Sequence, residues 1–261
     1  QTKERFELEF NLEKGTSFNT FFISSENELF VIHPPEKRYL SFFKKIISIF
    51  CNQLQVNKIN FITGHINPQI IETIKNINTQ FQNLTIICSN PGFKLISELW
   101  NQKNPNNPES FEEVQLPKIT IIKKELILEL ENNSLELIPV PTARWPGGLI
   151  IYERNQEILL SEKIFSAHIA SEFWSETNRI STETDRKHFY DCLMAPMSNQ
   201  VIAITEKLIE YEIKTIAPLH GPAIEYSLKS FLNDYIRWGE NLSNNNPKIA
   251  LIYASAYGNT A

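Results

Sequence analysis

The sequence lacks the features that mark several large classes of protein. Its 261 residues carry a net charge of −5, and no basic stripe is present that could neutralise the phosphates of a nucleic acid. No apolar run approaches the roughly 18 residues that a membrane-spanning helix needs. The polar opening QTKERFELEF is unlike a signal peptide, and Gln1 in place of methionine favours an excised part of a longer protein. We therefore expect a cytoplasmic protein that binds neither nucleic acid nor membrane.

Cysteine is also scarce. Cys51, Cys88 and Cys192 are far apart, odd in number and free of any C-x-x-C spacing. This pattern predicts reduced, mostly buried thiols and gives little support to disulfides or a cysteine metal site. Hydrophobic residues make up 42% of the chain and charged residues 21%, which are ordinary values for a globular protein. The length suits one large α/β domain, or one domain and part of another.

The first part of the chain alternates between strand and helix patterns. Aromatic and β-branched runs broken by turn residues predict strands, and apolar residues at helical spacing predict helices. Pro68 suits the first turn of the helix that it begins. The strands are expected at residues 5–10, 19–24, 28–33, 58–63 and 84–89, and the helices at 38–50, 68–77 and 92–100. Residues 101–113 form a polar loop without periodicity.

The second part begins with hairpins and returns to helices. Strands are expected between Ile119 and Val140, at 149–154, at 157–162 and from Thr215, and helices at 185–195, 199–213 and 226–239. Pro196 should break or kink the helical run around it. Two mixed sheets packed face to face, with helices outside, predict an α/β fold of the four-layer αββα type. We expect this domain to span residues 1–246, and residues 247–261 to begin a second, truncated domain.

Four loops at strand ends stand out as a possible site. They are GHINPQI (64–70), TARWPGG (142–148), LSEKIFSAH (160–168) and APLHGPA (217–223), and SAYGNT follows near the end of the chain. Together they resemble the site loops of the metallo-β-lactamase fold and, more narrowly, those of the flavodiiron proteins. The resemblance covers essentially the whole chain. It implies a diiron domain followed by the start of a flavodoxin-like FMN domain, and electron transfer from FMN to dioxygen or, in some members, nitric oxide.

The metal positions implied by this resemblance have mostly changed. His65 and His220 match the first and last iron ligands of the family. Asn67 stands for a glutamate, Gln69 for an aspartate, Ile70 for a histidine, Arg144 for a histidine and Lys163, nineteen residues further on, for an aspartate. A diiron site needs anionic ligands to offset its charge, and here the carboxylates are gone and two cations have arrived. We therefore predict no metal and no confident catalytic residue in this domain.

Purely structural roles remain open for the same residues. His65 and His220 could simply satisfy loop backbone, and Arg144 and Lys163 could form ion pairs with Glu162 or other carboxylates. Two cations beside two histidines also suit an anion or water site. We expect His33 to be a turn residue and His168 and His188 to be structural. Trp145 and Trp174 are expected to be pocket wall or core and not electron relays.

The resemblance also implies a cofactor and a partner. SAYGNT places Ser255, Gly258, Asn259 and Thr260 where hydroxyls and backbone N–H groups suit a phosphate, and flavodoxins hold the FMN phosphate there. The truncated segment alone should bind no FMN. Ligand-poor members of the family in oxygenic phototrophs imply a subunit of an oxygen-reducing oxidoreductase that receives electrons from NAD(P)H or another donor. Its partner would be a second copy or a ligand-complete relative.

Two alternatives to this interpretation belong to other functional classes. The domain could be a non-catalytic dimerisation scaffold or an anion-binding module that keeps only the shape of the pocket. Hydrolysis of the metallo-β-lactamase kind is disfavoured, because no His-x-His-x-Asp-His motif is present to hold zinc and activate water.

Overall fold

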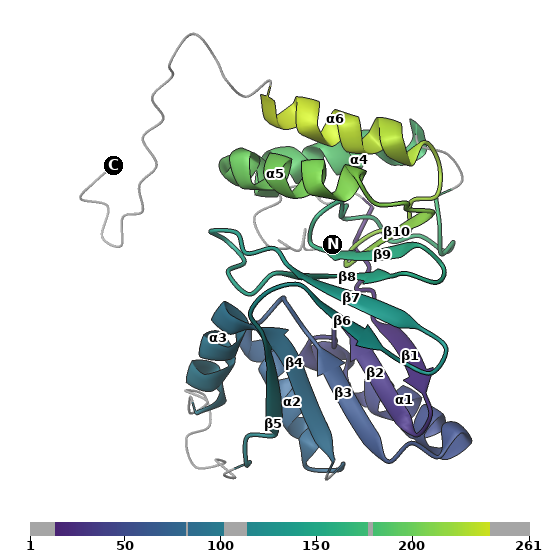
Figure 1. The fold of residues 1–261 in the computed structure, drawn as a ribbon, viewed down its shortest axis with the longest axis vertical. Coiled ribbons are helices and arrows are strands. Elements are labelled where there is room, and N and C mark those ends of the chain that lie inside the picture. Colours follow the sequence, from purple (N-terminus) through teal and green to yellow (C-terminus); the bar gives the residue numbers. More distant parts are fainter. Residues whose placement is uncertain (1–13, 82, 102–113, 177–179, 241–261) are drawn as a thin grey trace, which may run out of the picture.

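The computed structural model describes residues 14–81, 83–101, 114–176 and 180–240. Two five-stranded mixed sheets lie face to face, and helices cover the outer side of each sheet, as Figure 1 shows. The structure therefore confirms the predicted four-layer αββα arrangement.

The first sheet has the strand order β1-β2-β3-β4-β5. The first pair, β1 and β2, is antiparallel, and all later pairs in this sheet are parallel. Helices connect the parallel strands, as parallel pairing requires. The strands are β1 (Phe21–Ser25), β2 (Glu28–Ile32), β3 (Lys58–Ile62), β4 (Leu84–Ser89) and β5 (Lys118–Ile122), and the helices are α1 (Leu40–Leu54), α2 (Pro68–Asn78) and α3 (Asn90–Trp100).

The second sheet has the order β10-β9-β8-β7-β6. Only β10 and β9 are parallel, and the other neighbours form antiparallel hairpins. The strands are β6 (Leu126–Glu129), β7 (Ser134–Pro139), β8 (Leu149–Glu153), β9 (Ile158–Glu162) and β10 (Thr215–Pro218), and the helices are α4 (Ile180–Phe189), α5 (Ser198–Ile209) and α6 (Leu228–Glu240).

Three apolar clusters hold the layers together. One lies between the first sheet and its helices, one between the two sheets, and one between the second sheet and its helices. Because β4 is buried along its whole length, its apolar residues contact both the helices and the second sheet. The predicted stripe on α6 contributes Phe231, Leu232 and Tyr235 to the third cluster.

The helical run around Pro196 differs from the prediction in detail. It begins earlier, with α4, continues as a π-helix over Tyr190–Met194 and tightens to a 3₁₀ turn over Ala195–Met197 before α5 starts. Proline lacks the N–H of a regular helical hydrogen bond, so the chain changes pitch where it occurs. The expected strand at residues 5–10 and the expected domain boundary near residue 246 lie outside the described residues.

The three cysteines are free, as predicted, but only Cys88 is buried. Cys51 and Cys192 are half-buried, so the prediction of mostly buried thiols is correct for one of the three. No helix in the described ranges is long and apolar enough to cross a bilayer.

Candidate functional site

The predicted site loops meet at one edge of the sandwich. Parallel strands bring their carboxyl ends to the same edge, which is where α/β folds place their sites. The pairs Ile32 with Ile62 and Pro218 with Glu162 fix this alignment in the two sheets. The residues that follow these strands therefore converge. The loop from Val140 to Gly148 joins them, because Ser89 at the end of β4 donates to the Gly147 carbonyl at 2.8 Å.

The first loop places one possible ligand in the site. His65 is half-buried, and its Nε2 lies 3.2 Å from the amide nitrogen of Asn67. Gly64 packs so closely against the second sheet that a Cβ there would lie 2.4 Å from Leu149 N and 2.7 Å from Glu162 Oε2. Only glycine allows this approach, which ties the His65 loop to the end of β9.

The other three positions of this loop have structural roles. Asn67 is the N-cap of α2, and its Oδ1 accepts a hydrogen bond of 2.9 Å from Ile70 N. Such a cap stabilises a helix by about 1 kcal/mol. Gln69 is exposed, and Ile70 is 1% exposed within the core between the first sheet and its helices. The Ile70 side chain is therefore part of the hydrophobic core.

Lys163 and His220 form the centre of the site. Lys163 Nζ lies 2.9 Å from His220 Nε2, and both residues are almost wholly buried. The other ring nitrogen of His220, Nδ1, donates to the Ser17 carbonyl at 2.7 Å, which leaves Nε2 as the acceptor. The Nε2 lone pair of His220, which could bind a metal, is thus directed at the lysine ammonium.

Arg144 lies at the outer edge of the site. Its guanidinium is exposed and sits 5.3 Å from the centre of the Trp145 ring, and Lys163 Nζ sits 5.9 Å from the same ring. Trp145 is half-buried against the core, so it is a wall of the site as predicted. The face of an indole ring attracts cations, and Trp145 therefore helps to hold two positive charges near each other.

Two further histidines lie near the site, although neither has the spacing of a metal ligand in the sequence. His33 follows β2 with a positive φ of 58°, as a turn residue, but its ring is buried. The His168 ring lies 4.9 Å from the His220 ring. We call His33, His65, Lys163, His168 and His220 the histidine–lysine cluster. The signal that could have found His33 is its position directly after a parallel strand, next to the strand that carries His65.

Burial and charge together hold the histidines neutral. Burial lowers the pKa of His33 to about 3, and the Lys163 charge adds to the effect. Burial likewise holds the pKa values of His65 and His220 well below their usual range, again with a contribution from Lys163. Of the three rings, His220 is the one that Lys163 Nζ contacts directly, at 2.9 Å.

Glu162 does not replace the missing carboxylate ligands. Its Oε2 accepts a hydrogen bond of 3.0 Å from Leu149 N, and its Oε1 is buried without a hydrogen-bond partner. Burial raises the pKa of this carboxyl to about 7, although the Leu149 hydrogen bond and the Lys163 charge oppose the shift. The backbone here has a positive φ of 56°, which non-glycine residues seldom adopt away from functional sites.

The side chains at the seven positions do not fit a diiron centre. They supply two imidazoles, one of which is bonded to Lys163, and no carboxylate. Across the part of the chain that the structure describes, no three His, Cys, Asp or Glu side chains are grouped to hold a metal ion. The expected FMN phosphate residues, Ser255, Gly258, Asn259 and Thr260, lie outside the described residues.

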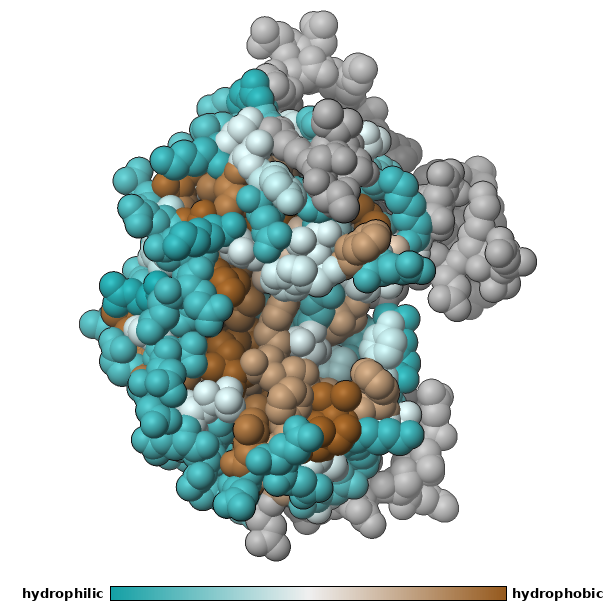
Figure 2. All heavy atoms as spheres, turned by 90° about the vertical axis from the view of Figure 1, so that its right-hand side faces the viewer, coloured by the Kyte–Doolittle hydropathy of each residue, from teal (hydrophilic) through white to brown (hydrophobic). Residues whose placement is uncertain are grey.

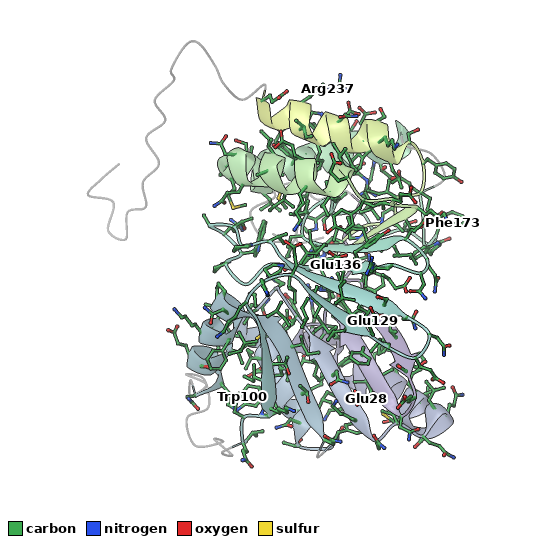
Figure 3. All side chains as sticks on the ribbon, viewed as in Figure 1. Glu28, Trp100, Glu129, Glu136, Phe173 and Arg237 are labelled. Atoms are coloured by element: carbon green, nitrogen blue, oxygen red, sulfur yellow. The ribbon has the colours of Figure 1, made fainter. Side chains whose placement is uncertain are left out.

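A pocket of about 490 Å³ lies beside the cluster. Phe18 and Phe21 line it, and the same two rings contact His220 and His33 edge-on at 5.6 Å and 6.1 Å. Phe173 and Trp174 line it too and are exposed, and Figure 3 shows Phe173 at the periphery of the molecule. Figure 2 shows the hollowed and apolar middle of this face. Two phenylalanine rings thus separate the cluster from an open pocket.

The lowered histidine pKa values predict a loss of stability in acid. A histidine with a folded-state pKa near 3 stays neutral while the unfolded chain takes up its proton near pH 6.5. Its contribution is therefore complete above pH 6.5 and falls by about 2 kcal/mol on going to pH 5. Glu162 acts in the opposite sense, because its raised pKa lowers stability as the pH rises from 4.5 through 7. Three histidines outweigh one carboxyl, so the free energy of unfolding should fall between pH 6.5 and pH 5.

His33→Asn tests this expectation, because asparagine tolerates the same positive φ and does not titrate. Urea unfolding at pH 7.5 and pH 5 should show about 2 kcal/mol less acid destabilisation in this variant than in the unmodified protein. His188 is exposed, and His188→Asn is the matched control for replacing a histidine as such. Equal pH dependence in His33→Asn and the unmodified protein would contradict the assignment to His33.

Sequence comparison supports the fold and the family. A family model described as "ODP family beta lactamase" matches residues 16–221. The chain is 33% identical over 259 residues to diflavin flavoprotein A 3 of Synechocystis sp. and 34% identical over 262 residues to diflavin flavoprotein A 6 of Nostoc sp.. These matches cover 98% and 100% of the chain but 41% and 43% of the relatives, so the chain spans about two fifths of their length.

Solved structures show the same similarity. The metal-soaked flavodiiron core of Flv1 from Synechocystis sp. PCC6803 matches with a TM-score of 0.79 at 31% identity, over 95% of this chain and 59% of that one. The flavodiiron protein of Giardia intestinalis matches with a TM-score of 0.74 over 88% of this chain and 53% of that one, at 21% identity, which is a likeness of fold alone. The chain belongs to the ODP family of β-lactamase-like domains and is the metallo-β-lactamase-like domain of a flavodiiron protein.

Proposed function

We propose that the protein containing this domain is a subunit of a flavodiiron-type oxidoreductase whose own iron site has been lost. In this proposal electrons pass from NAD(P)H or another donor through FMN to dioxygen, which is reduced to water. The observation that carries the loss of iron is the hydrogen bond between Lys163 and His220. A metal at this position would have to displace a buried ammonium from the one imidazole that remains directed at it.

The other positions support the same conclusion. Ile70 is part of the core, Gln69 is exposed and Asn67 caps a helix, so none of the three present side chains supplies an anionic ligand. Two divalent or trivalent cations beside Lys163 and Arg144 would face positive charge without carboxylates to offset it. Reduction of dioxygen at iron would therefore take place in a partner subunit.

The partner is a ligand-complete relative in this proposal. A ligand-poor subunit would then supply flavin electrons across the interface to the iron of its partner. A homodimer of this chain would have iron in neither subunit and would reduce oxygen only through its flavins. The choice between the two assemblies decides whether the protein contributes to catalysis at iron.

Oxygen uptake by mixtures tests the proposal. The full-length protein, a ligand-complete relative and an equal mixture of both would be supplied with NAD(P)H, and their iron contents measured after anaerobic loading. We expect little iron in this protein and a faster rate for the mixture than for the relative alone. A mixture with a relative whose iron ligands have been replaced is the control and should show no gain. A full diiron complement in this protein, or no gain on mixing, would contradict the proposal.

A second candidate function is non-catalytic. The domain would be a dimerisation scaffold, or a module that binds an anion where the metals were. Both ring nitrogens of His33 and Nδ1 of His65 are buried without a hydrogen-bond partner, which favours the anion-binding form. The mixing experiment separates the candidates, because a scaffold that does not transfer electrons would increase assembly without increasing oxygen uptake.

A further inference from the structure

One outer edge of the first sheet is open. β1 pairs with β2 on one side, and no described strand pairs with it on the other side. An outer strand presents a row of backbone N–H and C=O groups that can pair with another chain. Native proteins usually protect such a strand with charged side chains, proline, bulges or short length. An outer strand without this protection therefore indicates a site of strand pairing.

The outer strands of the two sheets are β1, β5, β6 and β10, and they differ in protection. β5 begins with the exposed Lys118, and β6 has four residues and ends in Glu129. β10 ends in Pro218, and an isolated bridge joins its Ile216 to Ile224. β1 has the sequence FFISS, with neither charge nor proline, and its register with β2 contains no bulge. Of these four strands, β1 is therefore the best suited to pair with another chain.

Both faces of β1 are apolar. Alternate residues of a strand point to opposite faces, so Phe22 lies on one face, and Phe21 and Ile23 lie on the other. The Phe22 ring stacks on Phe50 of α1 at 4.9 Å, and the Phe21 ring contacts His33 at 6.1 Å. All three β1 side chains are only half-buried. A strand added beside β1 would bury them further if it were apolar on both faces, as β1 itself is.

The helix α1 has an exposed apolar stripe on the same side of the molecule. The stripe consists of Tyr39, Phe42, Ile46 and Ile49, and Phe42 is 67% exposed and Ile49 50%. Phe22 and the first three stripe residues line a pocket of about 420 Å³, and none of its described lining residues is charged. Figure 2 views the side on which β1 and α1 lie in Figure 1 and shows an apolar, hollowed surface. We call β1 and this stripe the β1–α1 face.

We infer that the β1–α1 face binds a second copy of this chain, with the two β1 strands paired antiparallel across a two-fold axis. The two first sheets then form one continuous sheet, and the two α1 stripes lie side by side beside the junction. A two-fold axis requires a surface that is complementary to itself. The face meets this requirement, because each copy supplies a strand that is apolar on both faces and receives the same strand. A lipid surface, in contrast, offers no regular backbone groups to β1.

This inference goes beyond the proposed function, because it concerns the association of the domain and depends neither on iron nor on electron transfer. Sedimentation equilibrium of the 261-residue chain should show a reversible dimer. We expect a Kd on the order of 10 µM, since two short strands and two helix stripes form a contact at the small end of specific interfaces. The amides of β1 should exchange their hydrogens more slowly at concentrations where the dimer forms.

Two variants test the strand and the stripe separately. Ser24 is exposed on β1, and Ser24→Lys places a charge at the strand junction, as protected outer strands do. Phe42→Glu replaces the exposed ring of the stripe. Each variant should raise the Kd of the dimer about 30-fold or more, because a two-fold axis brings every change into the contact twice. Both side chains are exposed, so the folded monomer should keep its circular dichroism spectrum.

Phe173→Glu is the matched control. Phe173 is also 67% exposed, but it lies outside the β1–α1 face, so its replacement should leave the Kd unchanged. A single-chain mass at about 200 µM, far above the expected Kd, would overturn the inference. So would an unchanged Kd in Ser24→Lys or Phe42→Glu, or β1 amide exchange that does not depend on concentration. Ser24 and Phe42 are not site residues, so the oxygen-uptake experiment tests the proposed function separately.

Discussion

Replacing Arg186 with methionine is expected to lower the free energy of unfolding by about 3–5 kcal/mol. Arg186 is 1% exposed, and its guanidinium donates to the Phe165 carbonyl at 2.6 Å and to the Pro222 carbonyl at 2.9 Å. It also forms an ion pair of 3.2 Å with Glu176, which is itself buried. Methionine would leave an uncompensated carboxylate and two carbonyls without this donor in the interior. Urea unfolding monitored by circular dichroism measures the loss.

The adjacent Lys187 provides a matched control. It lies on the same helix and pairs with Asp191, but both side chains are substantially exposed. Lys187→Met removes the same charge and should change stability by about 0.5 kcal/mol or less. Adding Glu176→Leu to Arg186→Met should recover part of the loss, since it removes the stranded carboxylate. A loss below about 1 kcal/mol in Arg186→Met would show that water reaches this ion pair.

Arg186 also has a bearing on the site. Phe165 and Pro222 belong to the two loops that carry Lys163 and His220, and Arg186 bonds to the backbone of both. Arg186 therefore ties together the two loops that bring Lys163 and His220 within hydrogen-bonding distance. Phe165 has a positive φ of 68°, a strained conformation that persists only when its surroundings enforce it.

The second large effect is expected when all five lost ligands are restored together. The variant Asn67→Glu, Gln69→Asp, Ile70→His, Arg144→His and Lys163→Asp should bind iron after anaerobic loading, whereas the unmodified chain should bind almost none. His65 and His220 already stand at their positions, and removal of Lys163 frees His220 Nε2 for a metal. Elemental analysis of the loaded and desalted protein measures the difference.

This variant should be unstable until it is loaded. Ile70→His places a polar ring where a fully buried apolar side chain packed, at a cost of about 2–4 kcal/mol. Iron binding to the folded state should then raise the melting temperature of the variant and leave the unmodified protein unaffected. A four-fold variant that keeps Lys163 is the control and should bind much less iron. A folded five-fold variant without iron would show that the loops no longer have the geometry of a diiron site.

The sequence was sufficient to predict the layers, the order of elements and the loops that meet. Strand and helix patterns are local, and the ends of parallel strands must lie at one edge, so the meeting of His65, Lys163 and His220 followed from topology. The burial of the His33 ring could not be predicted from topology in the same way. A turn pattern reports the backbone of a residue, but whether its ring points into the interior depends on packing from distant strands.

The surroundings of the residues at the family's ligand positions could not be predicted from the sequence pattern either. Ile70, Gln69 and Asn67 were all interpreted as lost ligands of one site, yet the structure gives them three different surroundings. Helical geometry explains the difference, because neighbouring residues at the start of a helix point in different directions. Arg144 and Lys163 also differ in their surroundings. Arg144 is exposed beside the Trp145 ring, whereas Lys163 is buried against His220.

The hydrogen bond between Lys163 and His220 has a consequence for the supply of the protein in the cell. In a metalloprotein the charge of the site arrives after synthesis, and the abundance of mature protein follows the availability of the metal. In the proposed iron-free subunit, the positive charge is instead part of the translated chain, because Lys163 supplies it. Folding of such a domain would not depend on iron. When iron is scarce, the subunit would then continue to accumulate while its proposed iron-binding partners fall behind.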